Sequence, residues 1–136
     1  MDDFLIKVVL SVLLGGLIGI EREIRHKAAG IRTNMLVCLA SMTFTYFALL
    51  YFPSQDAARI IANILVGMGF IGAGSIIKEN EKVIGITTAA SLWLVTAIGV
   101  IIGLGFYYEA ILISLVAFFI LASKEIYLFL TRKNKW

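Results

Sequence analysis

The sequence predicts an all-α membrane protein, a bundle of about five transmembrane helices with the N-terminus outside and the C-terminus inside. The first observation is composition, since 60% of the 136 residues are hydrophobic, 15% are charged and the mean hydropathy is +0.95. A soluble chain of this length could not bury so much apolar surface. The second is a dense charge cluster at 21–32, which separates two stretches that are each apolar enough to cross a bilayer.

Five apolar stretches are expected to span the membrane, because a helix crossing a core of about 30 Å needs about 20 residues. The fourth and fifth are divided only at Gly103-Leu104-Gly105, where we expect a tight turn. A single long kinked helix is the alternative. The chain would then be one transmembrane domain, with spans at about 4–20, 33–52, 60–77, 85–103 and 106–121 and a cytoplasmic tail at 122–136.

The positions of lysine and arginine predict the orientation. Ten of the 12 basic residues fall in the loops after the first and third spans or in the C-terminal tail. Only Lys7 and Arg59 fall on the other side. Because basic loops stay on the cytoplasmic side, we expect the first loop and the tail to lie inside.

Small residues spaced four apart predict how the helices pack. Lipid tails are as apolar as leucine, so helices associate where small residues let their backbones approach closely. The third span is the richest in glycine, and we expect it at the centre of the bundle, with a flexible gate or broken helix as the alternative. The expected packing glycines are Gly15, Gly19, Gly69, Gly72, Gly74, Gly99 and Gly103.

Six segments, taken in order, carry a family resemblance. They are GLIGIERE, AGIRTNMLV, DAARI, GMGFIGAGSII, GITTAASLWLVTAIG and GLGFYY. Together they resemble the MgtC/SapB family from Gly15 to about Leu121. The resemblance implies a bacterial inner-membrane protein of about five helices, linked to growth in low magnesium and to virulence, that regulates other membrane proteins. Longer members carry a cytosolic domain after the last helix, so we expect a short form without it.

The resemblance falls on four polar residues of the first loop, namely Glu21, Arg22, Arg32 and Thr33. One interpretation is a salt-bridged helix end, which stabilises by only tenths of a kcal/mol. We favour a polar cluster in which Glu21 or Arg22 meets Arg32-Thr33 across the hairpin, because burial between helices would require pairing. Its role would be largely architectural.

Asp56, Arg59 and Asn63 follow one another near the outer end of the third span. Asp56 suits the first turn of a helix, where a carboxylate complements the helix dipole. Arg59 is costly in an apolar helix, so we expect it to pair with Asp56. The alternatives are a helix cap beside a snorkelling arginine, or a cation-sensing or partner-binding pair.

Hydroxyl residues open the fourth span at Thr87, Thr88 and Ser91. They can bond carbonyls of their own helix, or reach Ser75 of the third span or the Arg32 region. Trp93 lies too deep for an interfacial anchor, and we expect it to contact another helix or subunit.

Three classes of function compete. No nucleophile with a base, metal-ligand spacing or glycine-rich phosphate motif is present, so we expect no enzyme, no cofactor and no metal site. The basic residues form no continuous face, which argues against nucleic acid. A magnesium or other ion transporter would need carboxylates near the midplane, and the span cores have none. We favour a regulator that contacts other membrane proteins within the lipid bilayer, as a homo-oligomer.

Overall fold

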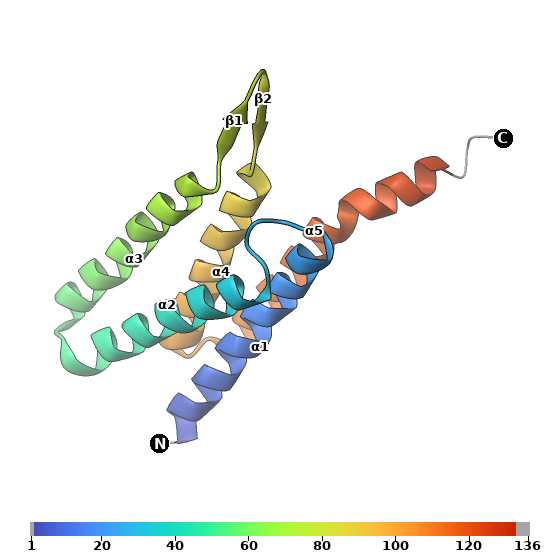
Figure 1. The fold of residues 1–136 in the computed structure, drawn as a ribbon. Coiled ribbons are helices and arrows are strands. Elements are labelled where there is room, and N and C mark those ends of the chain that lie inside the picture. The colour runs from blue at the N-terminus through green and yellow to red at the C-terminus, as the bar shows by residue number, and fades with distance from the viewer. Residues whose placement is uncertain (1, 133–136) are drawn as a thin grey trace.

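The computed structural model describes the backbone of residues 2–132 and the side chains of residues 3–123. Five helices follow one another, with a short β-hairpin between the third and fourth (Figure 1). The predicted fold class, an all-α membrane protein of about five helices, is confirmed. The helices are α1 (Asp2–Ile24), α2 (Ile31–Tyr51), α3 (Ser54–Gly74), α4 (Ile86–Leu104) and α5 (Tyr107–Arg132), and the strands are β1 (Ile77–Glu79) and β2 (Lys82–Ile84).

The helices have the length and surface of membrane spans. Four of them, α1 to α4, are long and apolar enough to cross a bilayer, and α5 begins with a shorter apolar segment at Tyr107–Ser123. Large apolar side chains cover the outside, including Phe70, which is 86% exposed, and Val66, which is 73% exposed. Lipid rather than water is the solvent that suits this surface.

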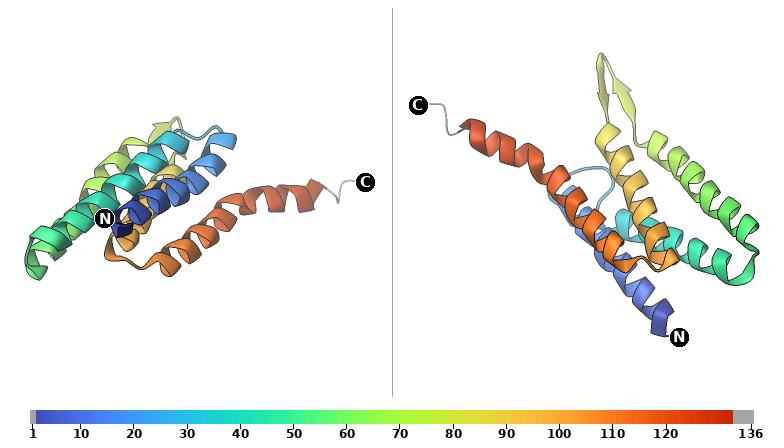
Figure 2. Two further views of the ribbon diagram at one scale, coloured as in Figure 1. Left: turned by 90° about the horizontal axis from the view of Figure 1, so that it is seen from below. Right: turned by 180° about the vertical axis from the view of Figure 1, so that it is seen from behind.

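Consecutive helices run in opposite directions, so the bundle has two ends (Figures 1 and 2). The hairpin end carries the α1–α2 loop and the β-hairpin. The N-terminal end carries the start of α1, the α2–α3 turn and the α4–α5 turn.

Helix α2 lies between α1 and α4 and packs against both (Figure 1). The main core joins these three helices to α5, whereas α3 reaches the bundle through a smaller cluster around Met68 and Leu92. The buried residues of the main core are Leu14, Ile18, Cys38, Met42, Val95, Ile98, Ile102, Ala110 and Ala117.

Glycines of α1 let this helix approach the backbone of α2. A Cβ atom at Gly15 would lie 2.8 Å from the carbonyl oxygen of Asn34, and one at Gly19 would lie 2.6 Å from Cα of Ile31. No larger residue fits without moving one helix. The two glycines are four apart, so both contacts lie on one face of α1.

Glycines of α4 make the equivalent contact on another face of α2. A Cβ atom at Gly99 would overlap the hydroxyl of Ser41 and the carbonyl oxygen of Cys38, and one at Gly103 would lie 2.6 Å from Cβ of Thr45. Helix α2 has no glycine of its own. Its two neighbours therefore supply the small residues for both of its close contacts.

The expectation that the glycine-rich third span lies at the centre is wrong within the single chain. In α3 only Gly72 faces a neighbour, where a Cβ atom would lie 3.7 Å from Ala89. No atom lies within 4 Å of the Cβ position at Gly67, Gly69 or Gly74. The glycines are spread around the helix, and only one face of it meets the bundle.

A β-hairpin replaces the simple loop expected between the third and fourth spans. Helix α3 ends at Gly74, so the chain leaves the helix before the expected limit at 77. The strands pair Ile77 with Ile84 and Glu79 with Lys82, and Asn80 opens the turn with φ 54°. Gly85 returns the chain to α4 with φ 91°, a conformation that favours glycine.

The break expected between the fourth and fifth spans lies at Gly105. This residue has φ 93°, and the amides of Gly105 and Phe106 donate to the carbonyls of Ile102 and Ile101, which ends α4. Helix α5 then runs along α1 and α4 and projects beyond them (Figure 2). It continues to Arg132, so the expected tail at 122–136 begins as helix, and 133–136 lie outside the described residues.

Replacing Gly99 by alanine should destabilise the fold, because the added methyl group must displace α2 from α4. Overpacking of this kind costs about 1–3 kcal/mol. Gly69→Ala is the matched control, since the same change in open space should be neutral or slightly stabilising through helix propensity. Melting temperature of the purified protein in detergent is the measurement. A Gly99→Ala variant as stable as the wild type would contradict the close contact.

Candidate functional site

A buried charge cluster of Glu21, Arg22 and Arg25 lies at the hairpin end of α1. Glu21 is 4% exposed and Arg22 is 3% exposed. The Arg22 Nη2 atom lies 2.5 Å from Glu21 Oε2, and Arg25 Nε lies 3.0 Å from Glu21 Oε1. One carboxylate therefore pairs with two guanidinium groups, which offsets part of the cost of burying Glu21 and Arg22, while Arg25 is only partly buried.

The structure does not join Arg32 and Thr33 to this cluster. Both are exposed, and among the described residues Arg32 makes no ion pair with Glu21. The favoured cross-hairpin pairing is therefore wrong, because Arg22 near the end of α1 and Arg25 in the turn just after it already pair with the carboxylate. Glu23 makes the polar contact across the loop instead, since its Oε2 accepts a hydrogen bond of 3.0 Å from the amide of Ile31.

Removing Glu21 should destabilise the protein strongly, because Arg22 would then be buried without its carboxylate. The expected cost of Glu21→Ala is about 3–5 kcal/mol, and the double variant Glu21→Leu/Arg22→Met should recover part of it. Arg32→Ala, which removes an exposed charge from the same loop, should change stability by less than about 0.5 kcal/mol. Thermal unfolding in detergent would measure all three. Equal losses for Glu21→Ala and Arg32→Ala would show that the buried pair is unimportant.

A second buried charge, Lys7, lies at the N-terminal end. Its ammonium lies 3.3 Å from Asp3 Oδ2 and donates to the carbonyl of Ile102 at 3.3 Å. It also lies 5.0 Å from the ring centroid of Tyr107, whose hydroxyl donates to Asp3. A cation suits this position at the last turn of α4. Lys7 thus ties together the starts of α1 and α5 and the end of α4.

The sequence predicts Lys7 only as a charge on the outer side and does not predict this role. Two signals were available. A lone lysine within an apolar helix needs a partner, and Asp3 precedes it by the four residues that place both side chains on one helix face. Tyr107, which is 104 residues away from Asp3, gave no such signal.

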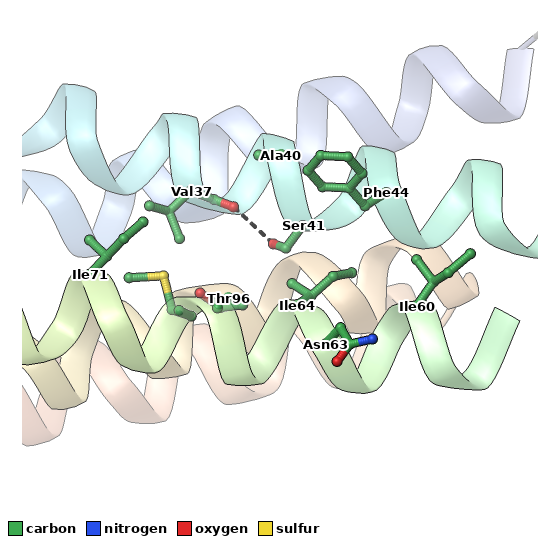
Figure 3. Close-up of a pocket in the computed structure, with 11 residues that line it drawn as sticks. Val37, Ala40, Ser41, Phe44, Ile60, Asn63, Ile64, Ile71 and Thr96 are labelled. Carbon is green, nitrogen blue, oxygen red and sulfur yellow. Dashed lines mark hydrogen bonds between the residues drawn. The ribbon is translucent and has the colours of Figure 1, made fainter. Parts of the chain in front are cut away.

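An apolar groove of about 460 Å³ runs between α2 and α3. Figure 3 shows side chains of α2 on one wall and of α3 on the other, with Thr96 of α4 behind them. Asn63 is the polar residue of the α3 wall. The groove is lined by Val37, Ala40, Ser41, Phe44, Ile60, Asn63, Ile64, Gly67, Met68, Ile71 and Thr96.

Asp56 and Arg59 do not form the expected ion pair. Both lie on α3 and are exposed, and no salt bridge joins them in the described part of the chain. Asp56 lies in the first turn of α3, as the helix-cap interpretation requires. The helix begins after Pro53 without a side-chain cap. Arg59 therefore lies at an exposed position near the N-terminal end, where its side chain can reach water.

The Ser91 hydroxyl near the start of α4 bonds within its own helix, which is the first of the two interpretations. Ser91 donates to the carbonyl of Thr88 at 2.8 Å, and Ser75 donates to the carbonyl of Gly72, so the alternative bond between Ser91 and Ser75 is not formed. Thr88 is buried and Thr87 is exposed. Trp93 is 51% exposed, so any partner that covers its indole belongs to another molecule.

Acidic and thiol groups are dispersed rather than gathered. Among the residues whose side chains are described, no group of three or more His, Cys, Asp or Glu could hold a metal ion. The buried hydroxyls of Ser11, Thr45, Thr96 and Ser114 each donate to a carbonyl four residues earlier in the same helix. These buried hydroxyls therefore satisfy their hydrogen bonds within the helices that form the core.

These features define a small multi-pass membrane protein. It has buried charges near both ends of the bundle and an apolar groove between two of its helices. The MgtC family model matches residues 8–127, and the chain belongs to the MgtC family.

Curated relatives agree with this assignment. The chain is 47% identical over 100 residues to Protein MgtC of Brucella abortus, covering 74% of this chain and 42% of that protein. It is 39% identical over 113 residues to the "Putative magnesium transporter YhiD" of Escherichia coli, covering 77% and 53%. Protein MgtC of Salmonella typhimurium is 39% identical over 116 residues, covering 85% and 50%.

The chain spans about half the length of the curated relatives it matches. None of the three names denotes an enzyme. No solved structure matches the chain.

Proposed function

We propose that this chain is a multi-pass protein of the bacterial cytoplasmic membrane that modulates magnesium-linked membrane physiology by binding transmembrane helices of other proteins, among them a second copy of itself. The observation that carries the proposal is the incomplete packing of α3. Gly67, which lines the groove between α2 and α3, meets no atom within 4 Å of its Cβ position. By contrast, Gly15 and Gly19 of α1 and Gly99 and Gly103 of α4 lie in close contact with α2.

Helix association in a bilayer depends on such close approach. Lipid tails are as apolar as the helix surface, so the hydrophobic effect does not favour helix contact over lipid contact. The groove between α2 and α3 offers a shape for it, with small residues Ala40 and Gly67 among its lining. A partner helix placed there would also find the side-chain amide of Asn63, a polar group that can bond across a helix contact. The exposed Trp93 on α4 provides a second apolar contact.

Filling the groove should impair partner binding without unfolding the protein. Gly67→Leu adds bulk to the groove wall, whereas Gly69→Leu adds the same bulk outside the groove lining, and both sites have room. We expect Gly67→Leu to reduce cross-linking from a photoreactive residue at Phe44 and to impair growth in low magnesium, with Gly69→Leu near wild type. Wild-type cross-linking and growth for Gly67→Leu would exclude the groove as the contact.

We infer the orientation from the basic residues, which gather at the hairpin end. With N-out topology, a cysteine at Ser54 should react with an impermeant maleimide added to intact cells, and one at Lys82 should react only after lysis. Both positions are exposed, and the native Cys38 is buried, so its background should be low. The reverse labelling pattern would overturn this orientation.

Magnesium transport is the second candidate, because the Escherichia coli relative is named a putative magnesium transporter. Mg²⁺ prefers oxygen ligands and keeps several waters. Two of the carboxylates do not form a common site for this ion, because Glu21 pairs with two arginines and Asp56 lies exposed at the opposite end of the bundle. Uptake of Mg²⁺ into proteoliposomes that hold an internal indicator dye separates the candidates, since only a transporter produces flux without a partner.

A further inference from the structure

Arg32 and Thr33 lie in a polar pocket of the α1–α2 loop that the proposed function does not use. The loop pocket has a volume of about 240 Å³. This is smaller than the roughly 300–1,000 Å³ of pockets that enclose a whole drug-sized molecule, so a single small polar group fits it. It is lined by Glu23, His26, Lys27, Ala28, Gly30, Arg32 and Thr33.

The charges of the pocket favour an anion. Lys27 and Arg32 contribute two positive charges and Glu23 one negative charge, so with neutral His26 the lining carries 2 − 1 = +1. The Glu23 carboxylate is engaged, because its Oε2 accepts from the amide of Ile31 at 3.0 Å. The ammonium, the guanidinium and the hydroxyl of Thr33 remain as donors. Such donors suit the several oxygens of a phosphate group.

The loop that forms the pocket is held in place. The amides of His26 and Lys27 donate to the carbonyls of Glu23 and Arg22 at 2.9 and 3.0 Å. Asn34, which is fully buried, donates to the carbonyls of Ala29 and Gly30 at 3.0 and 2.8 Å. Ordered donors bind a ligand with less loss of conformational entropy than a mobile loop would.

Gly30 is needed for the same arrangement. A Cβ atom there would overlap the Oε2 atom of Glu23, so a larger residue would shift this carboxylate from its present position at the amide of Ile31. With its carboxylate fixed at the start of α2, Glu23 leaves the basic side chains of the pocket available to an external anion.

In a bilayer, the pocket would lie at the depth of the headgroups. It joins the end of α1 to the start of α2, and both helices are membrane-spanning by length and composition. Ile24, just before it, is 71% exposed and marks the apolar limit of α1. Basic pockets between helix ends are suited to anionic headgroups.

We propose that the loop pocket binds a phosphate group through Lys27, Arg32 and Thr33. The net charge of +1 complements a phosphodiester, as found in the headgroup of an anionic phospholipid. The same donors would bind inorganic phosphate from solution. This site is independent of the α2–α3 groove, so it can be present whether or not the groove binds a partner.

The test compares two sources of phosphate with the full chain. In one arm, the protein is reconstituted in vesicles of phosphatidylcholine with or without phosphatidylglycerol, extracted, and its retained lipid counted by native mass spectrometry. In the other, inorganic phosphate is titrated into detergent-purified protein and followed by ³¹P nuclear magnetic resonance. Binding in either arm supports the site and identifies the source. Binding in neither arm overturns the proposal.

Variants locate the site. Lys27→Gln and Arg32→Gln should each weaken binding about tenfold, the effect of losing one charge-assisted contact. Thr33→Val keeps the charge and the shape, and should weaken binding severalfold. The control Lys78→Gln/Lys82→Gln removes two exposed charges from the hairpin at the same end and should leave binding unchanged. Equal losses for the hairpin control and the pocket variants, or no effect of Thr33→Val, would show diffuse attraction and overturn the proposal.

Discussion

The close approach of α2 to its two neighbours determines where every other element can lie. Gly15 and Gly19 of α1 and Gly99 and Gly103 of α4 bring three helix backbones together, and α2 itself needs no glycine because the others supply the space. With these distances fixed, the side chains of Ile18, Met42 and Ile98 meet in one core. Helix α5 completes that core through the small residues Ala110 and Ala117.

The buried charges depend on the same packing. Lys7 reaches the last turn of α4 only because α1 and α4 are both held beside α2, and Tyr107 completes its surroundings from α5. At the opposite end, Glu21 pairs with Arg22 and Arg25, its neighbours in sequence, while Nη1 of Arg22 is buried without a hydrogen-bond partner. One end is therefore fixed by tertiary contacts and the other by local ones. A buried charge that loses its partner is costly in both places.

Hydrophobic patterns along single helices predicted the spans, and the glycine pair before α5 predicted the turn. The predictions that proved wrong depend on which helices pack against each other, which these patterns do not show. Counting glycines placed α3 at the centre, although a close contact needs glycine on only one of two helices, and the neighbours of α2 provide it. Asp56 and Arg59 have suitable spacing, yet both are exposed and unpaired with each other among described residues. Sequence spacing shows which side chains can meet, and tertiary packing decides which of them do.

The connections of α3 have a mechanical consequence. Two residues, Phe52 and Pro53, join it to α2 at one end, and the narrow β-hairpin joins it to α4 at the other. Its one buried face rests on Ala57, Met68 and Gly72. A change in tilt therefore disrupts fewer contacts in α3 than in α1, α2 or α4. When bilayer thickness or lateral tension changes, α3 is the one of these four helices whose angle should adjust first, at modest energetic cost. The width of the groove beside it would follow the physical state of the membrane.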